Sequence, residues 1–132
     1  MAKKELTFKG KSEEELKAMG LNDFAKLITS RARRSLKRGL TEQQKKLLLR
    51  VKKVNDGKSK KPIKTHCRDM VIVPGMLGHN FLVHAGKEWF QVTVTYEMLG
   101  RCLGEFTMTR KKVSHSAPGI GATRSSASMS VK

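Results

Sequence analysis

The fold is decided at residues 81–94, which read FLVHAGKEWFQVTV. Residues 81–84 form a short apolar run, and in 89–94 apolar and polar side chains alternate with the two-residue period of a half-buried strand. Gly86 lies between the two runs and can supply the positive φ that a tight hairpin requires. The stretch therefore predicts a β-hairpin. Its predicted core face consists of Phe81, Val83, Phe90, Val92 and Val94.

A further strand is predicted just before this hairpin. Residues 70–73 read MVIV and are followed by Pro74-Gly75, a typical strand ending. The centre of the chain should therefore form a small antiparallel sheet. Residues 96–99 suit a single helical turn after it, and the spacing of Gly100 and Gly104 suits a turn with close packing.

Two capping boxes predict helices before the sheet. Ser12 followed by Glu15 opens a short helix, and Thr41 followed by Gln44 opens a longer one. The second of these helices should end at residues 55–57, which read NDG.

Apolar and basic side chains also recur with a helical period from residue 22 to residue 38. Asn22 or Asp23 can cap it, while Thr29-Ser30 allows either a kink or a second start, so one helix or two remain open. At about 100° per residue, the apolar side chains fall on one arc and the cations on the opposite one. The predicted core arc consists of Leu21, Ala25, Ile28, Ala32 and Leu36.

The C-terminal residues 107–132 differ from the rest of the chain. They contain no acidic and no aromatic residue, so they cannot bury enough apolar surface to offset the entropy lost on ordering. The predicted fold class is therefore α+β, with N-terminal basic helices packed on a small antiparallel β-sheet and an extended C-terminal tail.

The net charge of +17 is unevenly distributed over the 132 residues. Residues 1–60 carry +11, residues 61–106 only +1, and residues 107–132 carry +5. From Arg31 to Lys64 there are 14 lysines and arginines against two acidic residues. The nearly neutral centre suits a packed core, and the basic flanks require an anionic partner.

Nucleic acid is the anion that this charge pattern favours, because each neutralised phosphate releases counterions. The helices show no wide aromatic or leucine-rich face for a membrane surface, and no run of residues is long and apolar enough to span a bilayer. We expect RNA more than DNA, since no helix-turn-helix, finger or zipper pattern is present. The charged N-terminus and the two cysteines favour a cytoplasmic protein with reduced thiols.

Metal binding and catalysis are weaker hypotheses. The candidate zinc ligands lack the paired spacing of structural zinc sites, and no nucleophile motif or carboxylate pair is present, so we expect neither enzyme activity nor a metal or cofactor. These candidate ligands are His66, Cys67, His79, His84, Cys102 and His115.

Four segments resemble the small-subunit ribosomal protein nineteen family in its archaeal and eukaryotic form. They are 34–39 (RSLKRG), 62–70 (PIKTHCRDM), 86–109 with its spaced Gly-Lys and Leu-Gly-x-x-Leu-Gly-Glu-Phe, and 118–126 (PGIGATRSS). The hairpin differs from the commoner Asn-Gly of that family by having Ala85-Gly86.

The resemblance implies a structural component of the head of the small ribosomal subunit. Such proteins bind the 3′ major domain of the small-subunit ribosomal RNA, lie beside small-subunit protein thirteen, face the inter-subunit bridges, and extend a tail toward the decoding region and its transfer RNA. An architectural DNA-binding protein of the nucleoid is the alternative, and a small RNA-cleaving enzyme that uses His66 or His84 is a third.

The expected organisation is a helical extension at 1–30, one α+β RNA-binding domain at 31–106 and the basic tail at 107–132. Charge pattern and resemblance together predict a set of RNA-binding cations. They are Arg31, Arg33, Arg34, Lys37, Arg38, Lys45, Lys46, Arg50, Lys52, Lys53, Lys64, Arg68, Arg110, Lys111, Lys112 and Arg124.

Overall fold

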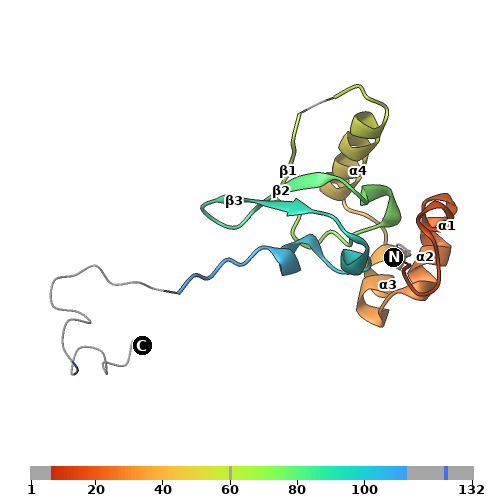
Figure 1. The fold of residues 1–132 in the computed structure, drawn as a ribbon, viewed down its shortest axis with the longest axis horizontal. Coiled ribbons are helices and arrows are strands. Elements are labelled where there is room, and N and C mark those ends of the chain that lie inside the picture. Colours follow the sequence, from red (N-terminus) through yellow and green to blue (C-terminus); the bar gives the residue numbers. More distant parts are fainter. Residues whose placement is uncertain (1–6, 60, 113–123, 125–132) are drawn as a thin grey trace, which may run out of the picture.

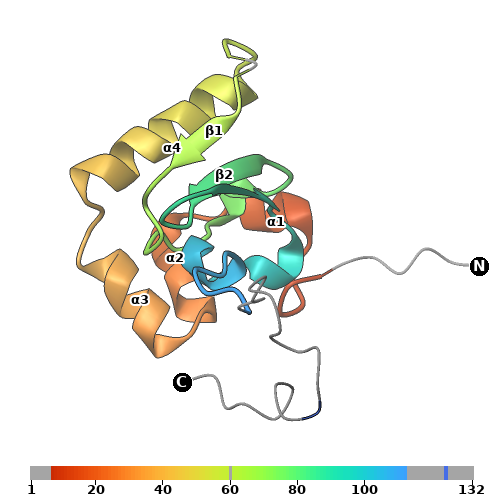
Figure 2. The same ribbon diagram turned by 90° about the vertical axis from the view of Figure 1, so that its left-hand side faces the viewer.

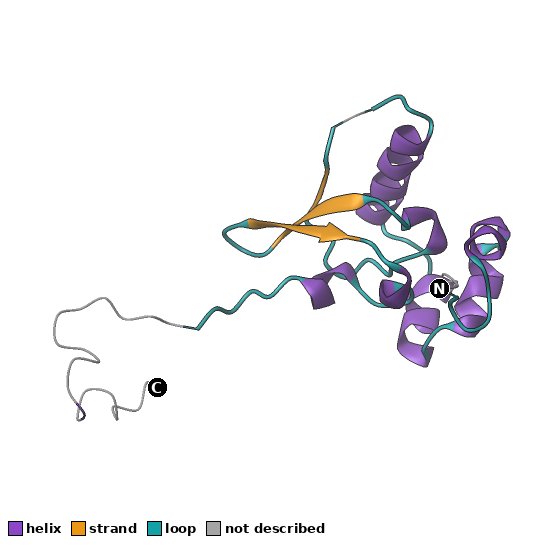
Figure 3. Ribbon diagram, in the orientation of Figure 1, coloured by secondary structure: helices purple, strands orange, loops and turns teal. Residues whose placement is uncertain are grey.

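The computed structural model describes residues 7–59, 61–112 and 124, and over these residues the fold is α+β (Figure 1). In the described part of the chain the α-helices precede the strands, and Figure 3 distinguishes helices from strands by colour. The helices are α1 (Glu13–Ala18), α2 (Leu21–Leu27), α3 (Ser30–Lys37) and α4 (Glu42–Asn55). The strands are β1 (Ile63–Thr65), β2 (Asn80–His84) and β3 (Trp89–Thr93), and the 3-10 turns are η1 (Pro74–Met76), η2 (Tyr96–Met98) and η3 (Leu103–Phe106).

The helical period at 22–38 divides into two helices, α2 and α3. Ile28 and Thr29 are extended between them, with ψ of 171° and 154°, so the restart that the Thr29-Ser30 pair allowed is present. The cap of α2 lies two or three positions before the expected Asn22 or Asp23. Gly20 precedes α2 and Thr29 precedes α3, and neither donates or accepts a side-chain capping hydrogen bond.

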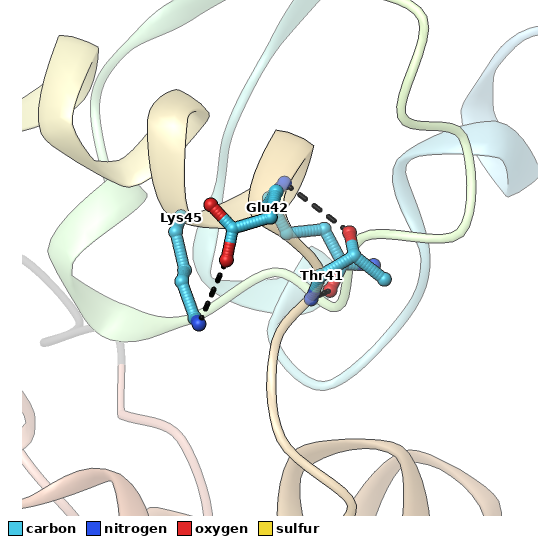
Figure 4. Close-up of polar contacts among 4 residues, drawn as sticks. Thr41, Glu42 and Lys45 are labelled. Carbon is cyan, nitrogen blue, oxygen red and sulfur yellow. Dashed lines mark hydrogen bonds and ion pairs between the residues drawn. The ribbon is translucent and has the colours of Figure 1, made fainter.

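The capping box of α4 is confirmed (Figure 4). The Gln44 backbone N–H donates to Thr41 Oγ1 at 3.4 Å, and the Thr41 backbone N–H donates to Gln44 Oε1 at 3.1 Å. Lys45 and Glu42 form an ion pair at 3.2 Å on the exposed side of the same turn. The helix buries Leu47 and Val51 and is followed by Asp56 at its C-cap, so both predicted ends are confirmed.

The sheet is mixed, and the prediction of an antiparallel sheet was correct only for its hairpin. β2 and β3 pair antiparallel, with Val83 opposite Phe90, but β1 pairs parallel to β2, with Lys64 opposite Leu82. The third strand is therefore β1 and not residues 70–73. Both views place β1 beside α4 (Figures 1 and 2).

Residues 70–73 are extended but lie outside the sheet. Val71 forms an isolated bridge with Cys102, and the Ile72 N–H donates to Arg101 O at 2.8 Å. All four side chains are at most 4% exposed. A continuous apolar run predicts that a segment is buried on all sides, and residues 70–73 are. The run does not show which segment forms hydrogen bonds with it.

One core joins the helices to the sheet. Phe81 and Val83 are fully buried, and so are Leu16 of α1 and Phe24 of α2, so α1 and α2 pack on the same core as the sheet. Leu21, predicted on the core arc, is 46% exposed, because the helix starts at this residue and Phe24 occupies the buried position instead. The other members of that arc are buried except Leu36, which is half-buried.

A hydrogen bond joins α1 to η2, far away in the sequence. The Tyr96 hydroxyl donates to the Glu13 carboxylate, which raises the pKa of Tyr96 to about 12. Lys17 lies 2.5 Å from the same carboxylate, and these two donors hold the pKa of Glu13 below its ordinary value. The first helix is thus held by polar contacts as well as by Leu16.

Gly100 and Gly104 pack closely, as their spacing suggested. Gly100 has a φ of +75°, and a Cβ there would lie 2.6 Å from Ile28 Cγ2. At Gly104 a Cβ would lie 3.0 Å from the backbone oxygen of Arg68. A larger residue is therefore excluded at Gly100 and would need a small shift of its neighbours at Gly104. Within the described residues, no helix has the length and apolar character needed to span a bilayer.

Replacing Phe81 by alanine should destabilise the protein by about 3–5 kcal/mol, because the ring is fully buried. Phe90 is only half-buried, although it was predicted in the core, and Phe90→Ala should cost about half as much. Urea unfolding of the two variants measures the difference. If both variants lose the same free energy of unfolding, Phe90 stabilises the fold as much as Phe81 despite its partial exposure.

Candidate nucleic-acid interface

Arg33 is one of the predicted RNA-binding cations, but its guanidinium lies within the fold. It donates to the backbone oxygens of Ala25 at 3.0 Å, Lys26 at 3.2 Å and Ile28 at 3.0 Å. These carbonyls lie at the C-terminal end of α2, where the helix leaves acceptors unpaired. Arg33 therefore joins α2 to α3, and its Nε and Nη2 donors are engaged before any partner arrives.

Arg68 is also a structural cation. Its guanidinium donates to His84 O at 2.7 Å, Gly104 O at 3.0 Å and Thr107 O at 2.6 Å. These three carbonyls belong to the end of β2, to η3 and to Thr107, the residue that follows η3. A guanidinium offers five donors in a planar fork, which suits several carbonyls at once. Arg68 thus joins the sheet to the C-terminal part of the fold.

The remaining cations of α3 are exposed. Residues 31, 34 and 38 are spaced i, i+3 and i+7 and therefore share one side of the helix, with residue 37 next to them. No carboxylate of the described residues lies within 4.0 Å of their charged nitrogens. We call this set the α3 cations. They are Arg31, Arg34, Lys37 and Arg38.

The predicted cations of α4 are all exposed, but they differ in their contacts. Lys45 is paired with Glu42, and Arg50 donates to Lys64 O at 3.1 Å. The other three, Lys46, Lys52 and Lys53, have no ion pair with any described residue.

A basic hollow of about 310 Å³ lies between the end of α4 and β1. Four cations line it together with apolar atoms of Val54 and Ile63. Lys61 is among them and was missed as a site residue, since the sequence shows it only as one lysine of a basic loop. The cations of this basic hollow are Arg50, Lys53, Lys61 and Lys64.

The C-terminal cations begin beside the hairpin. Arg110, Lys111 and Lys112 are exposed, and Lys111 Nζ lies 2.6 Å from the Glu88 carboxylate and 5.5 Å from the centre of the Phe90 ring. Thr107, expected as the first residue of the tail, is 2% exposed and packs within the fold. Arg124 is exposed, and the predictions for residues 113–123 and 125–132 lie outside the described residues.

The candidate metal ligands are not gathered into a metal site. Among the described residues, no group of three histidine, cysteine or acidic side chains could hold an ion, and His115 lies outside them. Burial lowers the pKa of His79 and raises that of Cys102, because it disfavours the charged form of each group. His66 and His84 lie together, with ring centres 4.4 Å apart.

An α+β fold whose helix carries cations without a carboxylate partner among the described residues, next to a basic hollow, is typical of basic proteins that bind polyanions. The family model for ribosomal protein S19 matches residues 34–115. The small ribosomal subunit protein uS19 of Cenarchaeum symbiosum (strain A) is 47% identical over 123 residues, which cover 93% of this chain and 94% of that protein. The chain belongs to the ribosomal protein S19 family.

Replacing Arg68 by glutamine should destabilise the fold by about 2–4 kcal/mol, because three carbonyls lose a charged donor. Arg101→Gln is the matched control. Its guanidinium is 64% exposed and lies 3.5 Å from Glu105, so its loss should change stability by less than about 1 kcal/mol. Urea unfolding measures both. If the two variants are equally stable, Arg68 is free for RNA and the structural assignment is wrong.

Proposed function

We propose that this protein binds small-subunit ribosomal RNA chiefly through the α3 cations and the basic hollow. Family membership makes the chain a structural constituent of the small ribosomal subunit and not an enzyme. It also removes the nucleoid and RNA-cleaving alternatives. The observation that carries the proposal is the α3 cations, which share one side of a helix and form no ion pair with a carboxylate of the described residues.

The contrast with other surface lysines supports this choice of surface. Lys11, Lys17 and Lys26 each lie within 3.6 Å of a carboxylate of their own helical region. The α3 cations repel one another in the free protein, and this repulsion is relieved only when a partner supplies negative charge. Phosphates along an RNA backbone supply it at short, regular intervals.

The finer assignment follows from the resemblance. It puts the protein in the head of the subunit, on the 3′ major domain of the RNA and beside small-subunit protein thirteen. The cations Arg110, Lys111, Lys112 and Arg124 then contact RNA along the C-terminal segment, which reaches toward the inter-subunit bridges and the decoding site with its transfer RNA. The likeness of residues 118–126 to the archaeal and eukaryotic tail supports this last step.

A triple variant of Arg34, Lys37 and Arg38, each replaced by glutamine, should flatten the salt dependence of RNA binding. Each lost phosphate contact lowers the slope of log K against log salt by about 0.7–0.9, so the slope should fall by about 2 to 3. Arg33 is left in place because it caps α2, so the melting temperature should not fall. Titration of a 3′-domain transcript at several salt concentrations measures the slope.

The matched control replaces Lys11, Lys17 and Lys26 by glutamine. It removes the same net charge from side chains that already have carboxylate partners, so the slope should change by less than half as much. If both triple variants lower the slope equally, RNA responds only to net charge, and the α3 cations are not the binding surface.

A further inference from the structure

Three aromatic rings lie next to one another on the surface of the sheet and are not part of the hydrophobic core. The ring centres of His66 and Trp89 are 4.9 Å apart, those of His84 and Trp89 are 4.9 Å apart, and those of the two histidines are 4.4 Å apart. Trp89 is 38% exposed and His66 is exposed as well. We call these three residues the aromatic cluster.

The register of the sheet explains why the rings meet. His84 lies directly opposite Trp89 in the antiparallel pair. Thr65 pairs with Val83 in the parallel ladder, so His66 follows one position beyond, next to His84. Successive side chains alternate between the two faces, and Thr65 and Val83 are buried. The aromatic cluster is therefore on the outer face.

Two further contacts hold the rings in place. The Gly86 backbone N–H donates to His84 Nδ1 at 3.3 Å, which orients the imidazole. Lys64 Nζ lies 5.6 Å from the centre of the Trp89 ring, a distance at which a cation is attracted to an aromatic face. The rings are thus ordered in the free protein while a part of their surface remains in water.

The aromatic cluster adjoins the basic hollow. Lys64 belongs to both, since it lines the hollow and also faces Trp89. Arg50 donates to the backbone oxygen of Lys64 and so ties α4 to this strand. A row of cations that leads to exposed rings is the combination with which proteins hold single-stranded nucleic acid, the cations on the phosphates and the rings on the bases.

We propose that the aromatic cluster stacks on an unpaired base of an RNA strand whose phosphates lie in the basic hollow. The ligand is thus an unstacked nucleotide in a loop or bulge, in addition to the backbone contacts of α3. The inference rests on the proposed function only in that the partner is RNA. It uses different residues and a different interaction, because a base contributes no net charge.

The single tryptophan of the chain reports directly on this contact, since Trp89 is the only one. A short single-stranded RNA of adenosines should quench its fluorescence when added to the full-length protein. An abasic strand of the same length keeps the phosphates but has no base to stack. It should leave the fluorescence nearly unchanged and bind about 5- to 100-fold more weakly at high salt.

Two variants separate stacking from charge. Trp89→Ala should weaken binding of the adenosine strand by about 5- to 100-fold and leave binding of the abasic strand unchanged. Trp89→Phe should restore most of the affinity, because it keeps an aromatic face. Lys61→Gln should weaken the two strands equally, because it removes only a phosphate contact. Anisotropy of labelled strands measures all three.

Equal affinity of the protein for both strands, or an unaltered preference in Trp89→Ala, would overturn the proposal. If the aromatic cluster only covers the hairpin, Trp89→Ala will keep the parent's preference between the two strands and will only lower the melting temperature. The outcome is independent of the α3 cations. The triple glutamine variant can leave the salt slope unchanged while the adenosine strand still quenches Trp89, and the reverse can also occur.

Discussion

The structure depends on the three hydrogen bonds that the Arg68 guanidinium donates to backbone carbonyls of His84, Gly104 and Thr107. Those carbonyls come from two segments that are not paired in the sheet, so one charged side chain closes the C-terminal part of the fold onto β2. Gly104 lets the two backbones approach closely, because a Cβ there would lie only 3.0 Å from Arg68 O. Charged donors form the strongest hydrogen bonds of this kind, and their geometry fixes the small sheet at its end.

This use of arginine inside the fold divides the cations into two groups. Arg33 and Arg68 direct their donors to carbonyls of the same chain, and they hold the frame on which the other cations are displayed. The α3 cations remain free of carboxylates among the described residues, so their charge is available to phosphate. In a protein with a net charge of +17, the structural arginines explain why a mutation at a basic position can reduce stability, RNA binding or both.

The three-stranded sheet has two faces with different roles. Phe81 and Val83 on the inner face are fully buried against the helices, while the outer face carries the aromatic cluster and ends at the basic hollow. Alternation along each strand produces this division, since neighbouring residues point to opposite sides. The parallel strand β1 adds Lys64 to the outer face, and His66 follows directly after it. The hairpin alone would contribute only His84 and Trp89 to the aromatic cluster.

The sequence by itself determined helix α4 with its capping box and the hairpin with Gly86 at its turn, because these depend on neighbouring residues. It also determined the α+β class and, through spaced motifs, the family. Local periodicity also located most of the core. It could not show that β1 rather than residues 70–73 joins the sheet, since strand pairing is a contact between distant segments. For the same reason it could not distinguish Arg33 and Arg68 from the exposed arginines. The sequence displays a positive charge, but only the tertiary structure decides whether carbonyls of the same chain or a partner's phosphates receive its hydrogen bonds.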